Sequence, residues 1–274
     1  MECPYRDLFI YYIQGCLDPR WEHRLGDDFL GNWEEDGTSF LFFSQPARKA
    51  VFDLVSQNPG LVLLDDYSMP YTQWQQDYDQ ILDIGRFSVC APWMGHEVPP
   101  GKTRLWMDPG VVFGTGTHPT TRDCMLALEL LYGEVKPRRV LDLGTGTGLL
   151  ALAAVALGAQ EVVAVDLNPL AAKTTARNVE LNDMGNAIQA VRGSALDYLL
   201  EPADLVVANI HYAVMKDMVS NPSFLRGKQF ILSGLLRSEI RDIKEKIIRL
   251  GAAVHKEWEQ ENTWFTIMGA GQNG

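Results

Sequence analysis

Two patterns of hydrophobic and polar positions divide this chain near residue 100. In the first part, apolar runs at residues 8–13, 39–43 and 61–64 predict strands. Between the last two, apolar residues at helical spacing predict a helix that starts at Pro46 and stops before the turn signal at residues 58–60. The order strand, strand, helix, strand predicts a small α+β module.

From Arg139 onward, strands and helices alternate regularly. The predicted strands are residues 140–143, 161–166, 188–192, 205–208 and 230–233, and the predicted helices are residues 148–157, 169–181 and 237–250. Such alternation predicts an α/β fold with a parallel sheet covered on both faces. Two final strands, at 252–258 and 263–268, follow each other without a helix, so we expect one antiparallel strand.

The stretch between these parts is rich in prolines and aromatics and predicts a connector. We therefore expect a small N-terminal domain at 1–65, a connector at 66–107 and an α/β domain at 108–274.

The charge of the chain is concentrated at one end. The 274 residues include 24 lysines and arginines and 35 acidic residues, for a formal charge of −11. Residues 1–100 carry −10 of this charge, and residues 101–274 carry only −1. An acidic chain argues against broad nucleic-acid binding, which depends on lysine and arginine. The acidic first part is interpreted either as a solvated surface or as a module that attracts a basic partner.

The cysteines and the first apolar run bear on the cellular compartment. The four cysteines form no CxxC pair, which argues against a zinc site and against a secreted disulfide framework. The run at 8–13 is six residues long without a basic leader, too short for a signal core or a membrane span. We expect a cytoplasmic protein that binds neither membrane nor metal.

A glycine turn between a strand and a helix is the main candidate binding motif. Residues 140–148 read VLDLGTGTG, with glycines at Gly144, Gly146 and Gly148. Glycine lets a backbone approach a ligand closely. Leu149 stands where the dinucleotide fingerprint needs its third glycine. Asp142 would repel a pyrophosphate but attract the amino group of S-adenosylmethionine, so we favour that cofactor over a nicotinamide dinucleotide. The alternative is an ordinary tight turn.

Polar residues end the following strands, at the sheet edge where ligands of α/β folds bind. Asp166 can accept both ribose hydroxyls of an adenosine, or it can simply begin the next helix. Ser194 and Ala195 fall where an adenine edge would lie. Asn209 can accept a hydrogen bond from a substrate amine, or it can cap the next helix.

A loop rich in glycine and threonine precedes the sheet, at residues 108–121. Ordering such a loop is costly in entropy, so we expect it to close on a ligand or a neighbouring segment. Thr120 or Thr121 is predicted to cap the helix that follows. His118 stands before a proline, and we interpret it as a structural hydrogen-bonding residue rather than a catalytic base.

Together these residues resemble the bacterial PrmA family, the methyltransferases of ribosomal protein L11, over residues 84–268. The stretches that carry the resemblance are residues 84–87, 92–93, 108–121, 140–148, 165–166, 207–210 and 232–235. The loop at 113–121 is far more specific than the glycine turn. The resemblance implies a seven-stranded, Rossmann-like, S-adenosylmethionine-dependent methyltransferase sheet. It also implies a small ferredoxin-like substrate-recognition domain in front.

The resemblance further implies that Thr121, Gly144, Asp166 and Asn209 contact the cofactor. Combined with the motifs, the predicted cofactor-binding set is Thr115, Gly116, Thr121, Asp142, Gly144, Gly146, Gly148, Asp166, Ser194, Ala195 and Asn209. The predicted catalytic residues are Asn209 and Thr117.

Two positions depart from the family pattern. Thr145 stands where the family commonly has cysteine, a harmless change. After Asn209 and Ile210, the chain continues with His211 and Tyr212 in place of leucine and small residues, and these side chains would border the acceptor site.

The predicted function is methyl transfer to amines of a ribosomal protein, with L11 as the leading candidate; the amines are lysine side chains, an N-terminal amine, or both. A basic ribosomal protein suits the acidic first part of the chain. One alternative is the same reaction on another protein or a small molecule. A second alternative is a non-catalytic protein that binds the cofactor.

Overall fold

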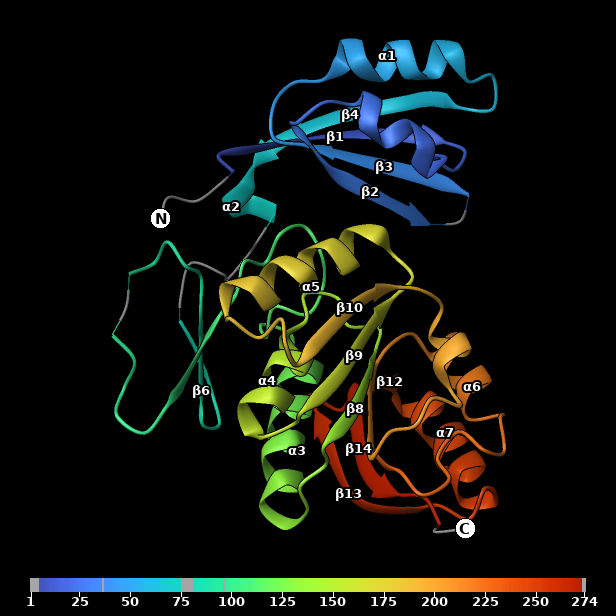
Figure 1. Ribbon diagram of the computed structural model, residues 1–274. Coiled ribbons are helices and arrows are strands. Elements are labelled where there is room, and N and C mark those ends of the chain that lie inside the picture. The colour runs from blue at the N-terminus through green and yellow to red at the C-terminus, as the bar shows by residue number, and fades with distance from the viewer. Residues whose placement is uncertain (1–4, 36, 75–80, 96, 273–274) are drawn as a thin grey trace. The chain divides into compact units, whose positions relative to one another are not determined.

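The computed structural model describes residues 5–35, 37–74, 81–95 and 97–272 (Figure 1). Two compact units make up the chain: Met1–Asp79 with Asn168–Leu170, and Gln80–Leu167 with Ala171–Gly274. The division at residue 79 lies within the stretch that the sequence assigns to the connector. None of the helices in the described part of the chain combines the length and apolarity that a membrane span requires.

The smaller unit is built on a four-stranded antiparallel sheet. Its elements are β1 (Asp7–Gln14), the 3-10 helix η1 (Pro19–Arg24), β2 (Phe29–Glu35), β3 (Thr38–Phe43), α1 (Arg48–Gln57), β4 (Val62–Pro70) and the short α2 (Tyr71–Trp74). The strand order is β2-β3-β1-β4, and β1 pairs antiparallel with both β3 and β4. Strands β3 and β4 therefore run in the same direction, with α1 as their crossover. This is the ferredoxin-like order, with a 3-10 helix in the place of the first helix.

Strand β2 is the element of this unit that sequence reasoning missed. Gly31 and Asn32 interrupt its apolar pattern, and its pairing with β3 shifts register between Phe29 and Gly31. A bulged edge strand of this kind does not show the alternation that predicts a strand.

The two faces of this sheet differ. Helix α1 packs Val51 and Leu54 onto one face, against a core that includes Phe43. Because side chains alternate along a strand, Tyr12 and Phe40 lie on the opposite face. Their rings stack with centroids 4.7 Å apart.

The stretch expected as a connector contains regular structure of its own. It holds the end of β4 and a three-stranded sheet of β5 (Leu82–Ile84), β6 (Phe87–Cys90) and β7 (Thr103–Trp106). These strands have only three or four residues, so the prolines around them dominate the sequence pattern.

The larger unit contains the predicted seven-stranded sheet, in the order β10-β9-β8-β11-β12-β14-β13. Its strands are β8 (Arg139–Leu143), β9 (Glu161–Asp166), β10 (Ile188–Arg192), β11 (Leu205–Asn209), β12 (Gln229–Leu236), β13 (Ala253–Gln260) and β14 (Trp264–Ala270). The first five strands in this order pair in parallel. Strand β14 runs antiparallel to both of its neighbours. The prediction of a parallel sheet with one antiparallel strand is confirmed.

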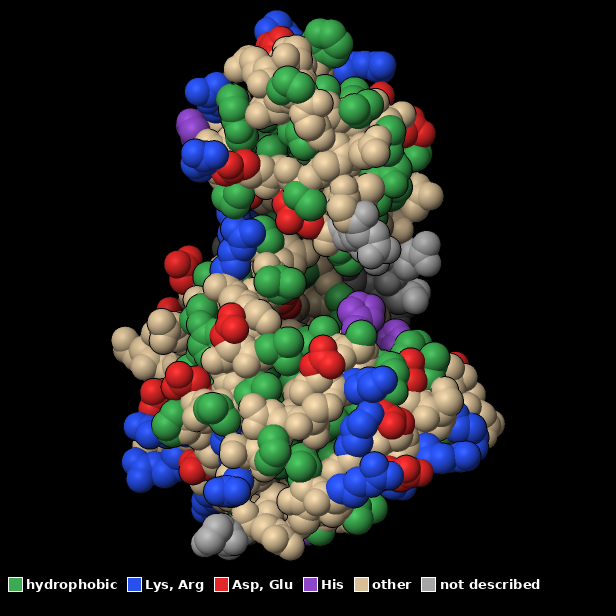
Figure 2. Space-filling view, turned by 90° about the vertical axis from the view of Figure 1, so that its right-hand side faces the viewer, with side chains coloured by type: hydrophobic (Ala, Val, Ile, Leu, Met, Phe, Trp, Pro, Cys, Tyr) green, Lys and Arg blue, Asp and Glu red, His purple; other side chains and the backbone are tan. Residues whose placement is uncertain are grey.

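Helices cover both faces of this sheet (Figure 1). Helices α3 (Pro119–Glu134), α4 (Leu149–Leu157) and α5 (Pro169–Leu181) lie on one side, and α6 (Tyr212–Met218) and α7 (Arg237–Arg249) lie on the other. Helix α7 buries Ile240, Ile243 and Ile247. Basic and acidic side chains are interspersed on the side that carries α6 and α7 (Figure 2). Some of these side chains form ion pairs, such as the 2.7 Å contact between Lys244 and Glu257.

Two asparagines, Asn178 in α5 and Asn182 just after its end, hold the segment that leads from β7 to the glycine–threonine loop. The side chain of Asn182 accepts from the N–H of Trp106 at 2.9 Å and donates to its carbonyl at 2.7 Å. Asn178 makes the same pair of bonds with Asp108, at 2.8 and 2.9 Å. Each side-chain amide therefore satisfies the backbone N–H and C=O of one residue, as a paired strand would. These bonds fix the path of the chain into the loop.

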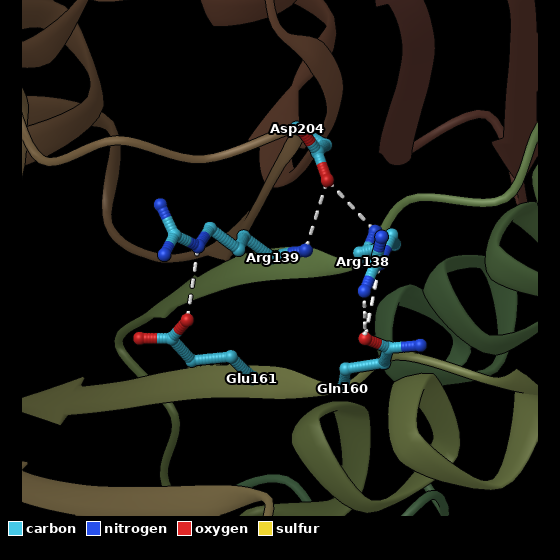
Figure 3. Close-up of polar contacts among 5 residues, drawn as sticks. All are labelled: Arg138, Arg139, Gln160, Glu161 and Asp204. Carbon is cyan, nitrogen blue, oxygen red and sulfur yellow. Dashed lines mark hydrogen bonds and ion pairs between the residues drawn. The ribbon is translucent and has the colours of Figure 1, made fainter.

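Hydrogen bonds close the amino end of the sheet (Figure 3). The carboxylate of Asp204 accepts from the backbone N–H groups of Arg138 and Arg139, at 2.8 and 2.9 Å. The two arginine side chains bond to Gln160, just before β9, and to Glu161, the first residue of β9. These bonds join β8 to both neighbouring strands at one edge, while the residues predicted to bind ligands lie at the opposite, carboxyl edge.

Candidate active site

The strand order of the sheet reverses between β8 and β11, and ligands of open α/β sheets bind at the carboxyl ends of strands on either side of such a point. Asp142 lies near the end of β8, Asp166 ends β9 and Asn209 ends β11. The structure therefore brings these three predicted residues to one edge.

The glycine turn is shaped by the chain itself. Gly144, Gly146 and Gly148 all have positive φ angles, of 76°, 57° and 86°. A Cβ at Gly146 would stand 2.3 Å from the carbonyl oxygen of Phe113, and one at Gly148 would stand 2.9 Å from the Thr175 side chain. Close packing against other protein atoms therefore requires glycine at these positions. The bare backbone also allows a ligand to approach.

The 113–117 loop lies directly against this turn. Thr147 donates from its N–H to the carbonyl of Phe113 at 3.0 Å and from its hydroxyl to the carbonyl of Gly114 at 2.7 Å. The hydroxyls of Thr115 and Thr117, both predicted site residues, bond to each other at 3.0 Å. The expectation that the loop closes on a neighbouring segment is met by the glycine turn.

The start of α3 corrects the predicted cap. His118 is the N-cap residue, and its Nδ1 accepts from the N–H of Thr120 at 3.3 Å. Thr120 and Thr121 lie inside the helix instead, because Pro119 takes its first position. Arg122 donates to the carbonyl of Gly116 at 2.9 Å and so ties the predicted Gly116 to this helix.

Asp142 is fully buried behind the turn. Its Oδ2 accepts from the hydroxyl of Thr145 at 2.6 Å, while its Oδ1 has no hydrogen-bond partner among the described residues. Burial raises the pKa of the Asp142 carboxyl to about 7, although the Thr145 bond opposes this shift.

Asp166 lies at the carboxyl end of β9, partly exposed, and its Oδ2 accepts from the N–H of Gly146 at 3.0 Å. This bond orients the carboxylate over the turn. Ser194, by contrast, caps the 3-10 helix η2 (Ala195–Tyr198) by accepting from the N–H of Leu196 at 3.3 Å. Its side chain has a structural partner, and Ala195 is buried beside it.

The side chain of Asn209 is held by two threonines of α3. Its Nδ2 donates to the hydroxyl oxygens of Thr120 and Thr121, at 3.2 and 3.3 Å. Its Oδ1 lies on the other side, 2.9 Å from the point where a Cβ of Gly234 would stand, and the Ile210 carbonyl oxygen lies 3.1 Å from the same point. Two carbonyl-type acceptors therefore approach the same point beside Gly234. Asn209 does not cap α6, whose N-cap residue is His211.

The two residues that depart from the family pattern have different surroundings. His211 is exposed. The hydroxyl of Tyr212 donates to Asp242 of α7 at 2.8 Å, and Lys216 lies 5.9 Å from the centre of its ring. Tyr212 thereby joins α6 to α7.

Sequence reasoning missed several residues of this edge. Ser233, at the end of the parallel pairing of β12, donates to the carbonyl of Thr120 at 3.4 Å, and Gly234 leaves room for the Asn209 amide. The signal was present, because Ser233 ends its strand as Asn209 ends the neighbouring strand. Trp264 had no such signal, and only the fold brings its ring to His118, with centroids 4.9 Å apart.

These surroundings fit S-adenosylmethionine better than a dinucleotide. The unpartnered Asp142 oxygen and the glycine backbone suit a cationic amino acid portion, and the Asp166 carboxylate suits a ribose diol. A pyrophosphate would meet two carboxyl groups and no basic side chain among these residues.

Comparison with known families decides the relationship. A family described as "Ribosomal protein L11 methyltransferase (PrmA)" matches residues 68–272, more than half of the chain. The chain belongs to the PrmA family. The resemblance seen in the motifs is confirmed.

Relatives within the PrmA family differ in the fraction of their length that aligns with this chain. A ribosomal protein L11 methyltransferase of Geobacillus kaustophilus is 37% identical over 202 residues, which cover 72% of this chain and 63% of the relative. One from Deinococcus radiodurans is 33% identical over 256 residues, which cover 89% and 90% of the two chains. The chain thus spans less than two thirds of the length of the first relative.

A solved PrmA-type structure supports the fold. The ribosomal protein L11 methylase of Lactobacillus delbrueckii subsp. bulgaricus superposes with a TM-score of 0.62 at 27% identity, covering 72% of this chain and all of that one. The predicted Rossmann-like methyltransferase fold is confirmed.

The buried Asp142 predicts a pH dependence of stability. In the unfolded chain an aspartate ionises near its ordinary pKa of about 3.9, whereas the folded pKa is about 7. The stabilising contribution is therefore full below about pH 4 and is lost as the pH rises to about 7. We expect the unfolding free energy of the wild type to fall across this window relative to Asp142→Asn, by about 1.4 kcal/mol for each unit of pKa difference. Urea unfolding of both proteins measures this, and parallel pH curves would contradict it.

Proposed function

We propose that this protein transfers methyl groups from S-adenosylmethionine to amino groups of ribosomal protein L11. The observation that carries the proposal is the Asn209 amide, held by two α3 threonines beside the glycine turn, in a chain of the PrmA family. The L11 methyltransferase names of its relatives support the acceptor.

In this proposal, Asp166 accepts the ribose hydroxyls of the cofactor. The backbone of the 144–148 turn holds the amino acid portion, with Asp142 behind it. Ala195 and the backbone of Ser194 border the adenine, and the 115–117 segment lines the site. When bound, S-adenosylmethionine supplies an activated methyl group on a positive sulfur.

Asn209 and Ile210 orient the acceptor amine. A lysine amine has an ordinary pKa of about 10.4 and must release a proton to water before its nitrogen can form a bond to the methyl carbon as the carbon–sulfur bond of the cofactor breaks. Desolvation in the site lowers this pKa. The Asn209 Oδ1 and the Ile210 carbonyl then accept the two N–H bonds of the neutral amine, which points its lone pair away from them and toward the cofactor side. Positioning of this kind is the main contribution that such a displacement requires, and Thr117 is proposed to help shape the pocket.

The smaller unit is proposed to dock the basic substrate. The first hundred residues carry a charge of −10. On the sheet face opposite α1, the register aligns Trp33, Phe40, Tyr12 and the exposed Asp65 in one row across the four strands. Aromatic rings next to a carboxylate are suited to lysine and arginine side chains. Because ribosomal proteins are made in the cytoplasm, the proposal includes a cytoplasmic location.

This docking predicts a salt-dependent association rate. Charge steering raises encounter rates and is screened by salt. We expect the association rate constant for L11, measured by stopped-flow fluorescence, to fall roughly tenfold between low and physiological ionic strength. A rate constant independent of salt would show that the acidic surface does not steer the substrate and is only solvated.

Calorimetry tests the cofactor. We expect heat of binding with S-adenosylmethionine and none with NAD. Binding of S-adenosylmethionine without methyl transfer to any acceptor would favour a non-catalytic protein that binds the cofactor. Transfer to an acceptor other than L11 would favour a methyltransferase that acts on another protein or a small molecule.

A further inference from the structure

A chain of hydrogen bonds leads from His118 to the acceptor-binding amide. The N–H of Thr120 donates to Nδ1 of His118 at 3.3 Å. The hydroxyl of Thr120 lies 2.7 Å from the same nitrogen. The amide nitrogen of Asn209 lies 3.2 Å from that hydroxyl.

The first bond determines the direction of the others. A backbone N–H can only donate, so Nδ1 of His118 carries no proton and the neutral ring is protonated at Nε2. The Thr120 hydroxyl must then donate to Nδ1, which leaves its oxygen free only to accept. Asn209 consequently presents its NH₂ group to Thr120 and turns its carbonyl oxygen to the side where the Ile210 carbonyl lies.

We propose that His118 is a positioning residue that, through Thr120, holds the Asn209 amide in the orientation that accepts a hydrogen bond from the substrate amine. The inference rests on the proposed function and adds to it a residue, His118, that does not itself touch the acceptor amine. Protonation at Nδ1 would reverse the chain. His118 would then donate to Thr120, the Thr120 hydroxyl would donate toward Asn209, and the amide would be favoured in the flipped orientation.

The surroundings of His118 favour its neutral form. Its ring packs against Phe113 and Trp264, with centroids 5.3 and 4.9 Å away. Burial lowers the pKa of His118, and the charge of Glu261, in the turn between β13 and β14, opposes this shift. The third element packed against the ring is the start of α3, which presents the Thr120 hydroxyl.

Two pairs of variants test the relay by methyl-transfer kinetics at saturating cofactor and acceptor. Thr120→Val and His118→Phe keep shape but remove the hydroxyl or the Nδ1 acceptor, and we expect kcat to fall roughly 10- to 100-fold. Thr120→Ser keeps the hydroxyl. His118→Asn places an amide oxygen near the Nδ1 position and remains a good N-cap. These two should retain kcat within about threefold, and cooperative thermal unfolding above the assay temperature in all four variants will show that folding is preserved.

The pH profile separates positioning from packing. The acceptor amine titrates equally in both proteins, so the ratio of kcat for wild type to that for His118→Asn isolates His118. Because burial lowers the pKa of His118, we expect this ratio to fall only at pH values below the ordinary histidine pKa of about 6.5, whereas asparagine cannot be protonated. A constant ratio, or full kcat in Thr120→Val and His118→Phe, would overturn the proposal.

Nitrogen-15 NMR of the imidazole tests the relay without catalysis. We expect Nδ1 of His118 to be unprotonated and Nε2 protonated at neutral pH, with the Nδ1 resonance shifted in Thr120→Val. The opposite tautomer would overturn the relay. If the wild type transfers no methyl group, the proposed function fails, and this spectrum alone decides the relay.

Discussion

Asn209→Ala is expected to lower kcat for methyl transfer by at least roughly 100-fold, while the affinity for S-adenosylmethionine changes by no more than about threefold. The reason is geometric. Asn209 supplies one of two adjacent acceptors for the substrate amine, and Thr120 and Thr121 hold it from behind. Without it, the amine keeps only the Ile210 carbonyl and loses the orientation of its lone pair.

Steady-state kinetics with saturating acceptor, together with calorimetry of cofactor binding, measures both parts of this prediction. Asn186→Ala is the matched control, because Asn186 is an exposed asparagine of the same unit. Normal kcat in Asn209→Ala would remove Asn209 from the reaction. A parallel loss of cofactor affinity would instead assign it mainly to cofactor binding.

Asp166→Ala is expected to weaken binding of S-adenosylmethionine by roughly 100-fold. A hydrogen bond to a charged group contributes about 1.5–3 kcal/mol, and each 1.4 kcal/mol changes affinity tenfold. Asp166 is proposed to accept two such bonds from the ribose, and it also accepts the N–H of Gly146. The variant therefore loses the ribose contacts and one bond that shapes the turn.

Isothermal titration of both proteins tests this, with Asp183→Asn as the control, since Asp183 is exposed and its φ of 55° is one that asparagine tolerates well. If Asp166→Ala binds the cofactor as tightly as the wild type does, the ribose of the cofactor does not lie at the end of β9.

The parts of the fold that were predictable are those encoded by local pattern. Strand β9, strand β10 and helix α5 have the bounds that hydrophobic periodicity predicts, because each lies between clear turn signals. Strand β2 and the short strands β5 to β7 were hidden by glycines, prolines and small size. Helix α6 was missed because its seven residues are too few to show a period.

For the carboxyl edge of the sheet, the sequence predicts only which residues the topology places there. The carboxyl ends of the strands identify Asp166 and Asn209 as candidates. The contact between Asn209 and Thr120, however, joins residues 89 positions apart. Likewise, the carbonyl that excludes a Cβ at Gly146 belongs to Phe113, from a separate loop. The role of His118 as N-cap residue also depends on Pro119 taking the first helical position. Such contacts follow from tertiary packing, and the residue spacing within the glycine turn or within the 108–121 loop does not encode them.

Methyl transfer to ribosomal protein L11 is tested with S-adenosylmethionine labelled in its methyl group. The protein is incubated with this cofactor and purified, unmethylated L11, and the products are separated and weighed by mass spectrometry. The proposed function predicts label in L11, a mass increase of one or more methyl groups on amines, and loss of both with Asn209→Ala. Tight binding of the cofactor with no label in L11 would contradict it.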